Sequence, residues 1–225
     1  MGDNGIYKHA REGCLVIDSS TIAPDATREM TQEGEKLGLR IADVPVSGGY
    51  MGAKNGTLTC MIGCKKEDFK EVEAIFKCMG TNLFYCGEPG AGQSAKICNN
   101  LGLGIQMISV CESLSLAKKL GVDPTVVAKI MALSTGSCWS VKTYCPIPGF
   151  DPHLPASHDY DHGFESRLMK KDVGLALKEA SRVNIDLQFG KKAMKYWQDI
   201  EDRGWGKKDI GIMLHHIAEL KEKDE

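Results

Sequence analysis

The order of apolar and polar residues divides the chain into a first part that contains strands and a second part that does not. Four short apolar runs predict strands, at 14–18, 39–46, 57–62 and 82–86. Two amphipathic segments between them predict helices, at 24–38 and 66–79. Pro24 at the start of the first helix, and Gly38 and Gly80 at the two helix ends, suit those positions. We therefore expect an α/β region before about residue 90.

From residue 93 onward the periodicity is that of helices alone. Five helices are expected, at 93–120, 124–133, 164–181, 187–203 and 208–221. Asp123 before Pro124 fits a helix cap followed by the first turn. Between the helices, 136–163 carries four prolines and is predicted to be a long loop, of the kind that often forms a lid or a binding loop.

These patterns predict an α/β plus all-α fold. The first part, 1–89, is expected to be the C-terminal portion of a Rossmann-like nucleotide-binding domain. The second part, 90–225, is expected to begin with a long linking helix and to form an α-helical domain.

Composition and charge narrow the classes of partner. The 225 residues carry 28 basic and 30 acidic side chains, a net charge of −2, which gives no basic footprint for nucleic acid or anionic membrane. The longest uncharged run, 97–111, is shorter than the roughly 20 apolar residues of a membrane span. No targeting segment is visible near the start of the sequence. We expect small molecules or other protein chains as partners.

The cysteines and histidines give no metal signal. Nine cysteines include no C-x-x-C pair, and Cys60, Cys78, Cys98 and Cys111 lie in apolar patterns, which favours reduced, buried thiols. A histidine pair at 158 and 162 flanks two aspartates, but a solvated loop is the simpler interpretation. We predict no metal site.

Candidate chemistry is concentrated in 90–100, where Lys96 and Asn100 follow a glycine-rich helix start. Residues four apart share a helix face, so both side chains can contact one small molecule. The helix dipole and partial burial would lower the pKa of Lys96, which would then accept a proton. Taken alone, this lysine is more simply interpreted as a solvated surface charge. The segment lacks the strand, glycine turn and helix context of a dinucleotide fingerprint.

Several motifs together resemble the β-hydroxyacid dehydrogenase family, over nearly the whole chain. Three match at the family level: 43–49 (DVPVSGG), 90–100 (GAGQSAKICNN) and 168–172 (LMKKD). Two are more specific: 134–140 (STGSCWS) and 144–149 (YCPIPG). The resemblance implies NAD-dependent oxidation of a β-hydroxyacid, most closely of 3-hydroxyisobutyrate to methylmalonate semialdehyde in valine breakdown. It also implies a homo-oligomer in the mitochondrial matrix.

The resemblance also assigns roles to particular residues. Lys96 would be the general acid/base, and the substrate would be bound by Ser47, Gly48, Gly49 and Asn100. The cofactor would be contacted by Thr21, Phe164, Lys171 and Asp172. Each has a structural alternative: a surface charge for Lys96, an ordinary turn for 47–49, a helix cap for Thr21, a core aromatic for Phe164, and a helix salt bridge for Lys171 and Asp172.

One departure from the family pattern leaves alternatives open. The G-x-G-x-x-G turn that binds the pyrophosphate does not follow a strand in these 225 residues. We therefore predict weak NAD binding by this chain alone, and an exposed strand edge. A second hypothesis is an inactive chain that serves only as an oligomerisation partner, with Gly102 and Gly104 as a packing seam. A third is a related semialdehyde substrate, such as tartronate semialdehyde.

Overall fold

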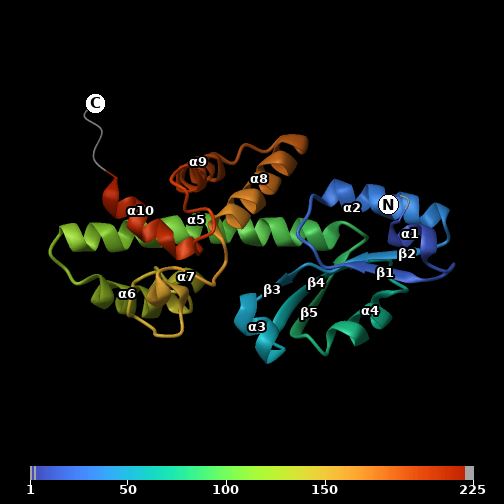
Figure 1. The fold of residues 1–225 in the computed structure, drawn as a ribbon, viewed down its shortest axis with the longest axis horizontal. Helices are drawn as coiled ribbons and strands as arrows, with labels where there is room; N and C mark the ends of the chain where they lie inside the picture. Colours follow the sequence, from blue (N-terminus) through green and yellow to red (C-terminus); the bar gives the residue numbers. More distant parts are fainter. Residues whose placement is uncertain (1, 3, 221–225) are drawn as a thin grey trace. The chain divides into compact units, whose positions relative to one another are not determined.

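A computed structural model describes residue 2 and residues 4–220 of the chain. The chain forms two compact units, Met1–Asn99 and Asn100–Glu225 (Figure 1). The first is built around a sheet and the second is helical, which confirms the predicted α/β plus all-α fold. The boundary that we predicted between residues 89 and 90 stays a prediction.

The sheet of the first unit is mixed. Its strands are β1 (Leu15–Asp18), β2 (Arg40–Asp43), β3 (Val46–Ser47), β4 (Leu58–Cys64) and β5 (Gly80–Gly87). β1 pairs with β2, and β4 with β5, in parallel, whereas β2 and β3 both pair with β4 in antiparallel fashion. The single strand predicted at 39–46 is thus divided at Val44 and Pro45, because proline has no N–H to donate to a ladder.

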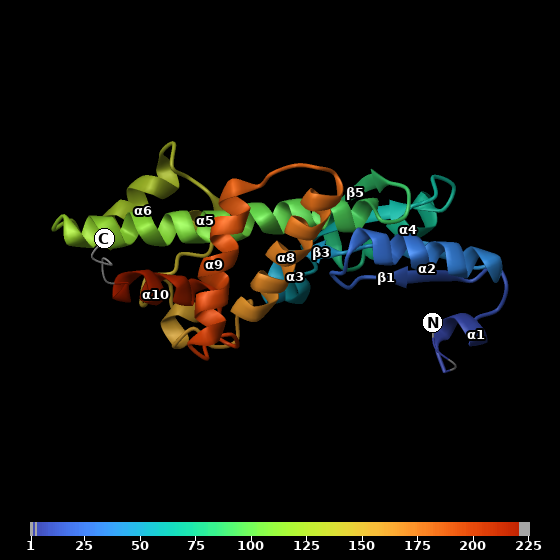
Figure 2. The same cartoon turned by 90° about the horizontal axis from the view of Figure 1, so that it is seen from above.

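Helices cover both faces of this sheet (Figure 1). The helices of the unit are α1 (Ile6–His9), α2 (Pro24–Lys36), α3 (Gly49–Asn55) and α4 (Phe69–Phe76). Ile41 packs with Tyr7 and Met30 on the α1–α2 side, and Figure 2 shows α2 running above β1. The next residue, Ala42, packs with Val72 and Phe76 of α4. This alternation along β2 buries both faces of the strand.

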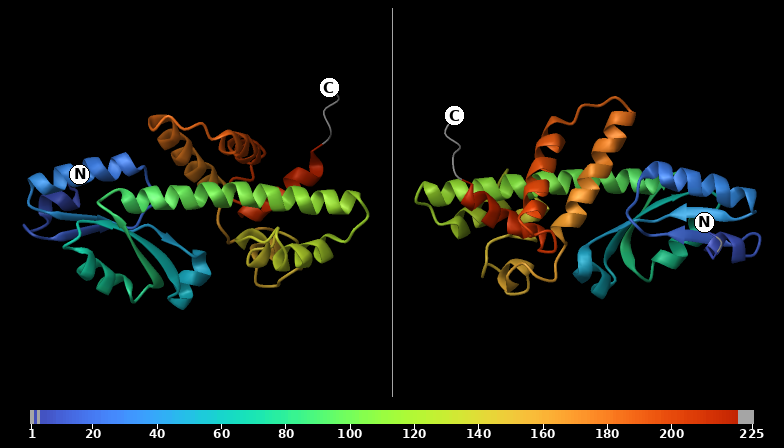
Figure 3. Two further views of the ribbon diagram at one scale, coloured as in Figure 1. Left: turned by 180° about the vertical axis from the view of Figure 1, so that it is seen from behind. Right: turned by 45° about the horizontal axis from the view of Figure 1, so that its top comes forward.

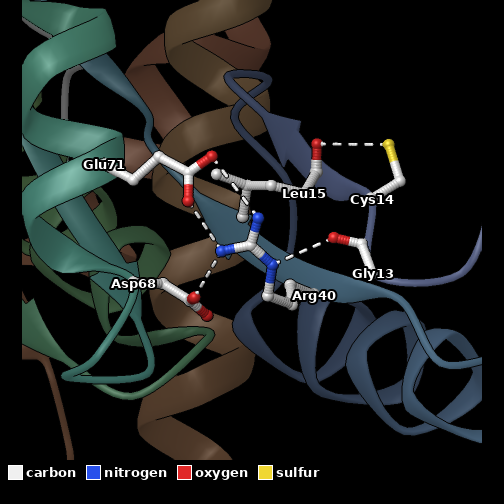
Figure 4. Close-up of polar contacts among 6 residues, drawn as sticks. All are labelled: Gly13, Cys14, Leu15, Arg40, Asp68 and Glu71. Carbon is white, nitrogen blue, oxygen red and sulfur yellow. Dashed lines mark hydrogen bonds and ion pairs between the residues drawn. The ribbon is translucent and has the colours of Figure 1, made fainter.

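Arg40 joins three segments of the first unit (Figure 4). Its Nη1 lies 2.8 Å from Asp68 Oδ1 and 2.7 Å from Glu71 Oε2, and its Nε donates to the Gly13 carbonyl oxygen at 3.1 Å. The hydrogen bonds to Glu71 and then to Asp68 raise the pKa of Arg40 above its usual value. The start of β2 is thereby tied to α4 and to the turn before β1.

The second unit consists of helices around one main core. The long helix α5 (Ala91–Lys119) begins in the first unit and continues into the second. It is followed by α6 (Pro124–Leu133), α7 (Trp139–Lys142), η1 (Pro155–His158), α8 (Ser166–Arg182), α9 (Gln188–Asp202), η2 (Ile210–Ile212) and α10 (Met213–Glu219). Figure 3 shows α8 and α9 crossing α5 at a steep angle.

Of the two glycines that could form a packing seam on α5, only Gly104 lies in a contact. A Cβ at Gly104 would stand 2.9 Å from Val173 Cγ2, so the glycine allows α8 to approach α5 closely. A Cβ at Gly102 would meet nothing within 4 Å. Gly104 therefore belongs to the core of the second unit itself.

The segment predicted as a loop at 136–163 contains the short helices α7 and η1. It is held by its own hydrogen bonds: Ser157 Oγ donates to the Asp151 carbonyl at 2.6 Å, and Tyr160 O–H to the Pro146 carbonyl at 3.1 Å. His158 Nε2 lies 2.7 Å from the Pro152 carbonyl oxygen. Among the described residues no cluster of three or more His, Cys, Asp or Glu could hold a metal ion. None of the described helices is long and apolar enough to span a membrane.

The nine cysteines are free thiols, as the spacing suggested, but they are not all buried. Cys60 and Cys111 are fully buried, whereas Cys78 and Cys98 are exposed, contrary to the prediction from their apolar surroundings. Both lie on faces of their segments that point away from the core, where an apolar sequence context does not guarantee burial.

Candidate active site

The first turn of α5 is capped by a buried carboxylate from β2. Asp43 is 0% exposed, its Oδ1 accepts from the Gly90 N–H at 2.6 Å, and its Oδ2 accepts from the Gln93 N–H at 2.7 Å. A negative charge at a helix N-terminus satisfies amides that have no partner within the helix. These amides are therefore occupied from within the protein, which agrees with the interpretation that the glycine turn is not a phosphate-binding fingerprint.

Two glycines make room for the Asp43 carboxylate. A Cβ at Gly63 would stand 2.7 Å from the Gly92 nitrogen and would overlap the Asp43 carboxylate. A Cβ at Gly92 would stand 2.8 Å from both the carbonyl and the carboxylate oxygens of Asp43. No side chain fits at either position, so Gly92 at the start of α5 allows close packing of the helix on β2 and β4. Burial raises the pKa of Asp43, and the N–H bonds from Gly90 and Gln93 oppose that rise.

The side chain of Gln93 connects the same turn to the loop after β1. Gln93 is 0% exposed; its Nε2 donates to the Ser20 carbonyl at 2.8 Å, and its Oε1 accepts from the Ile22 N–H at 3.2 Å. These two bonds flank Thr21. On the other side of the loop, Asp18 Oδ1 accepts from the Ser20 N–H at 2.8 Å. The backbone on both sides of Thr21, at Ser20 and at Ile22, is thus held by hydrogen bonds.

Lys96 lies on α5, three residues after Gln93, and is buried. Its exposed fraction is 8%, so the alternative of an ordinary surface charge is wrong. Thr21, which lies between the two residues bonded by Gln93, is half-buried in the same unit. The N-cap of α2 is Ala23, two residues after Thr21.

Ser47, Gly48 and Gly49 lie at the junction between β3 and α3. Gly48 and Gly49 have φ values of +132° and +64°, which favour glycine, and both are exposed. A Cβ at Gly49 would meet no atom within 4 Å, so a ligand can approach the backbone there. The segment is a strand-to-helix junction that contains two exposed glycines, where an ordinary turn was the alternative interpretation.

In the second unit the structure brings together three of the predicted site residues. Asn100, on α5 one turn after Lys96, is 2% exposed and donates from Nδ2 to Asp172 Oδ2 at 2.6 Å. Lys171 Nζ lies 3.1 Å from Asp172 Oδ1, so the salt bridge proposed as the structural alternative is present. Asp172 is 2% exposed, whereas Lys171 is exposed. A buried Asp172 therefore fixes the orientation of the Asn100 amide.

Phe164 is held by a second buried carboxylate rather than by these three residues. It is partly buried against the main core, and its N–H donates to Asp209 Oδ2 at 2.8 Å. The same oxygen accepts from Tyr144 O–H at 2.7 Å, and Asp209 Oδ1 accepts from the Gly211 N–H at 2.8 Å. Both of the predicted roles of Phe164, core aromatic and cofactor contact, are compatible with this position.

Sequence reasoning missed the residues that organise the site. Asp43 lies in the 43–49 motif and Gln93 in the 90–100 motif, but neither was predicted to have a role. Asp209 also escaped notice. A faint signal for Asp43 was its place at the end of an apolar strand that leads into Ser47-Gly48-Gly49, since polar groups at strand ends face the ligand edge of α/β sheets.

Family models match both units. The model for the NAD-binding region of NADP-dependent 3-hydroxyisobutyrate dehydrogenase matches residues 90–217. The model for the NAD-binding domain of 6-phosphogluconate dehydrogenase matches residues 1–87.

Curated relatives carry the same enzyme name as the first of these family models. Mitochondrial 3-hydroxyisobutyrate dehydrogenase of Mus musculus is 42% identical over 97% of this chain and 65% of its own length. The Pseudomonas aeruginosa 3-hydroxyisobutyrate dehydrogenase is 43% identical over 84% of this chain and 64% of its own length. The chain thus spans about 65% of the length of the curated relatives that it matches.

A solved structure shares the fold as well. The Mycobacterium tuberculosis 3-hydroxyisobutyrate dehydrogenase with L-serine superposes with a TM-score of 0.87 at 34% identity, over 94% of this chain and 72% of that one. With a family model over more than half of its residues and relatives above 40% identity over nearly all of it, this chain belongs to the 3-hydroxyisobutyrate dehydrogenase family.

Proposed function

We propose that this chain catalyses the NAD-dependent oxidation of 3-hydroxyisobutyrate to methylmalonate semialdehyde, a step of valine breakdown. The observation that carries the proposal is a buried lysine, Lys96, in the first turns of α5 of a chain that belongs to this family. The names of the relatives support the substrate, and the family models support a nicotinamide cofactor.

The residues of the first unit suit the nicotinamide end of the cofactor. Thr21 follows the carboxyl end of β1, where ligands of open α/β sheets bind. The start of α5 does not suit the pyrophosphate, because Asp43 occupies the Gly90 and Gln93 amides. We propose Thr21, Phe164, Lys171 and Asp172 as cofactor contacts, each on the basis of the family resemblance. When bound, NAD supplies the acceptor for the hydride.

The reaction needs one proton and one hydride to leave the substrate alcohol. In the proposed mechanism Lys96 Nζ takes the hydroxyl proton while the carbon-bound hydrogen leaves as hydride, so that the alcohol becomes an aldehyde. Burial of Lys96 keeps bulk water from competing for that proton. Ser47 O–H and the backbone N–H groups of the exposed residues Gly48 and Gly49 would bind the substrate carboxylate, and Asn100 would anchor the substrate beside the lysine.

The direct test is NADH formation by the purified chain with NAD and 3-hydroxyisobutyrate. Lys96→Ala should lower kcat by roughly 10²- to 10⁴-fold, the range for loss of a general base. Lys118→Ala, which removes an exposed lysine from the last turn of the same helix, is the matched control and should leave kcat unchanged. Because weak NAD binding is expected of this chain alone, the assay is run at saturating NAD. Full activity in Lys96→Ala, or no NADH from the unaltered chain at saturating NAD, would contradict the proposal.

The same assay separates the related substrate class. Tartronate semialdehyde with NADH, run in the reductive direction, would use the same proposed residues. We propose 3-hydroxyisobutyrate because the relatives above 40% identity carry that name. A kcat/KM for tartronate semialdehyde above that for methylmalonate semialdehyde would reverse this assignment.

We also propose a homo-oligomer located in the mitochondrial matrix. The names of eukaryotic relatives support a mitochondrial location, and the matrix follows from the family resemblance alone. Exposed apolar side chains on both sides of the turn between α5 and α6 support self-association: Leu116, Leu120, Val126, Ile130 and Leu133. Sedimentation of the unaltered chain against Leu133→Glu should show a smaller species in the variant. A chain that acts only as an oligomerisation partner would associate in this way yet form no NADH.

A further inference from the structure

The buried amide of Gln93 spans two elements that the proposed reaction must hold at a fixed separation. One is the loop of Thr21, proposed to contact the cofactor. The other is helix α5, which carries Lys96. We propose that Gln93 is a positioning residue for hydride transfer, which holds the Thr21 loop in register with the Lys96 helix. This inference rests on the proposed function.

The contacts of Gln93 allow one orientation of its amide. The Ile22 N–H can only donate and the Ser20 carbonyl can only accept, so Oε1 must face Ile22 and Nε2 must face Ser20. Both partners are backbone atoms on either side of Thr21. The side chain therefore fixes the backbone on both sides of Thr21.

The backbone of Gln93 is fixed in turn. Its N–H donates to Asp43 Oδ2, while Gly90, three residues earlier, donates to Asp43 Oδ1. Gly63 and Gly92 allow the carboxylate to lie directly against the backbone of β4 and α5, because a Cβ at either would overlap it. Asp43 thus fixes the start of α5, and the Gln93 side chain bonds this fixed turn to the Thr21 loop.

Lys96 lies three residues after Gln93 on α5, within one turn of the same helix. A displacement of the Thr21 loop relative to this turn would change the distance between the hydride acceptor and the base. Misplacement of reacting groups by about 1 Å can cost roughly 10²-fold in rate, even when binding is intact. We therefore expect Gln93 to act on kcat and to leave KM for the hydroxyacid nearly unchanged.

Two variants separate the hydrogen bonds from the packing. Gln93→Met keeps a side chain of similar length and removes both bonds. Gln93→Glu keeps an acceptor for the Ile22 N–H but places an acceptor against the Ser20 carbonyl. Ser94→Ala, on the same turn, is the matched control, because Ser94 Oγ donates to the Gly90 carbonyl, four residues earlier, rather than to the Thr21 loop.

The first readout does not need activity. Amide hydrogen exchange at Ile22 should accelerate about tenfold or more in Gln93→Met and stay unchanged in Ser94→Ala. Gln93→Glu should give an intermediate rate, and it decides the question if Gln93→Met does not fold. Unchanged exchange at Ile22 in a folded Gln93 variant would overturn the proposal.

The second readout is the division between kcat and KM in the NADH assay. The proposal expects kcat to fall by roughly 10²-fold in Gln93→Met, with KM within about threefold of the unaltered chain. A raised KM with unchanged kcat would overturn the positioning role. If the unaltered chain forms no NADH while Ile22 exchange responds to Gln93→Met, the proposed function fails and the link between the loop and α5 stands.

Discussion

Two buried aspartates, one in each unit, are built in the same way and serve different ends. Asp43 is 0% exposed and Asp209 is 2% exposed, and each accepts backbone N–H bonds through both carboxylate oxygens. Each is also pressed against a glycine, Gly63 or Gly163, at which a Cβ would overlap the carboxylate. A carboxylate can be buried in this way because N–H donors replace the water that it loses.

The partners of the two aspartates differ. The Asp43 carboxylate accepts from Gly90 and Gln93 at the start of α5, so it orders the turn that precedes Lys96. Asp209 bonds to Tyr144, Phe164 and Gly211, which come from three separate segments of the helical unit. The same device therefore serves a helix start at the candidate site in one unit, and the junction of loops in the other.

The largest effect is expected from Asp209→Ala. It leaves the Tyr144 hydroxyl and two backbone N–H groups without their acceptor inside the protein, and we expect a loss of roughly 3–5 kcal/mol in the free energy of unfolding. Urea unfolding measures this loss. Asp202→Ala, at the exposed end of α9, is the control, and a loss below about 1 kcal/mol in Asp209→Ala would contradict the account.

Asp43→Ala should cost less, about 2–3 kcal/mol, because two backbone donors lose their acceptor and no side chain does. The same urea experiment applies. If Asp43→Ala lost as much free energy of unfolding as Asp209→Ala, or more, the comparison would fail. The number of donors left without an acceptor would then not determine the loss in stability.

Tyr144→Phe removes the side-chain donor of Asp209, for which Asp43 has no counterpart. We expect a loss of about 1–2 kcal/mol in the free energy of unfolding, which urea unfolding measures.

The same substitution changes how stability depends on pH. Burial raises the pKa of both Asp43 and Asp209, so the folded chain holds these protons more tightly than the unfolded chain. Their contribution to stability is therefore full at low pH and falls as pH rises from about 4 through the folded pKa.

The Tyr144 hydrogen bond lowers the pKa of Asp209. In Tyr144→Phe the fall in stability should consequently continue to higher pH than in the unaltered chain. Urea midpoints between about pH 3.5 and 7 measure this. Identical pH profiles for the two proteins would show that Tyr144 does not bear on the titration of Asp209.

The smallest effect is expected from Glu71→Gln, at an exposed carboxylate that pairs with Arg40. Solvent screens an exposed ion pair, so stability should not change measurably. A loss comparable to that of Tyr144→Phe would mean that burial is not what distinguishes Asp43 and Asp209 from surface carboxylates.

Much of the fold could be predicted because its elements are long and periodic. α2, α5, α8 and α9 lie within a few residues of the predicted ranges, and apolar runs located β1, β4 and β5. The short helices α1, α3 and α7 were missed, since four to seven residues are too few to show a helical period. The four prolines of 136–163 led to the prediction of a loop, whereas side-chain hydrogen bonds to the backbone order this segment.

The candidate site could be predicted only where its residues interact along one helix. Lys96 and Asn100 share a helix face by their spacing, and this local pattern is readable in sequence. Asp43 and Gln93 meet backbone atoms that lie 47 to 73 residues away. No spacing rule indicates such contacts, because any aspartate or glutamine can bond to a backbone N–H that folding brings near.

The most direct measurement is amide hydrogen exchange at Gly90 and Gln93 in the chain with Asp43→Asn. The carboxamide can accept from only one of these two N–H groups through its oxygen, so its NH₂ must face the other donor. The account predicts exchange about tenfold faster or more at one or both amides, with Phe164 and Gly211, which bond to Asp209, unchanged. Unchanged exchange at both Gly90 and Gln93 would contradict the claim that Asp43 holds the start of the Lys96 helix.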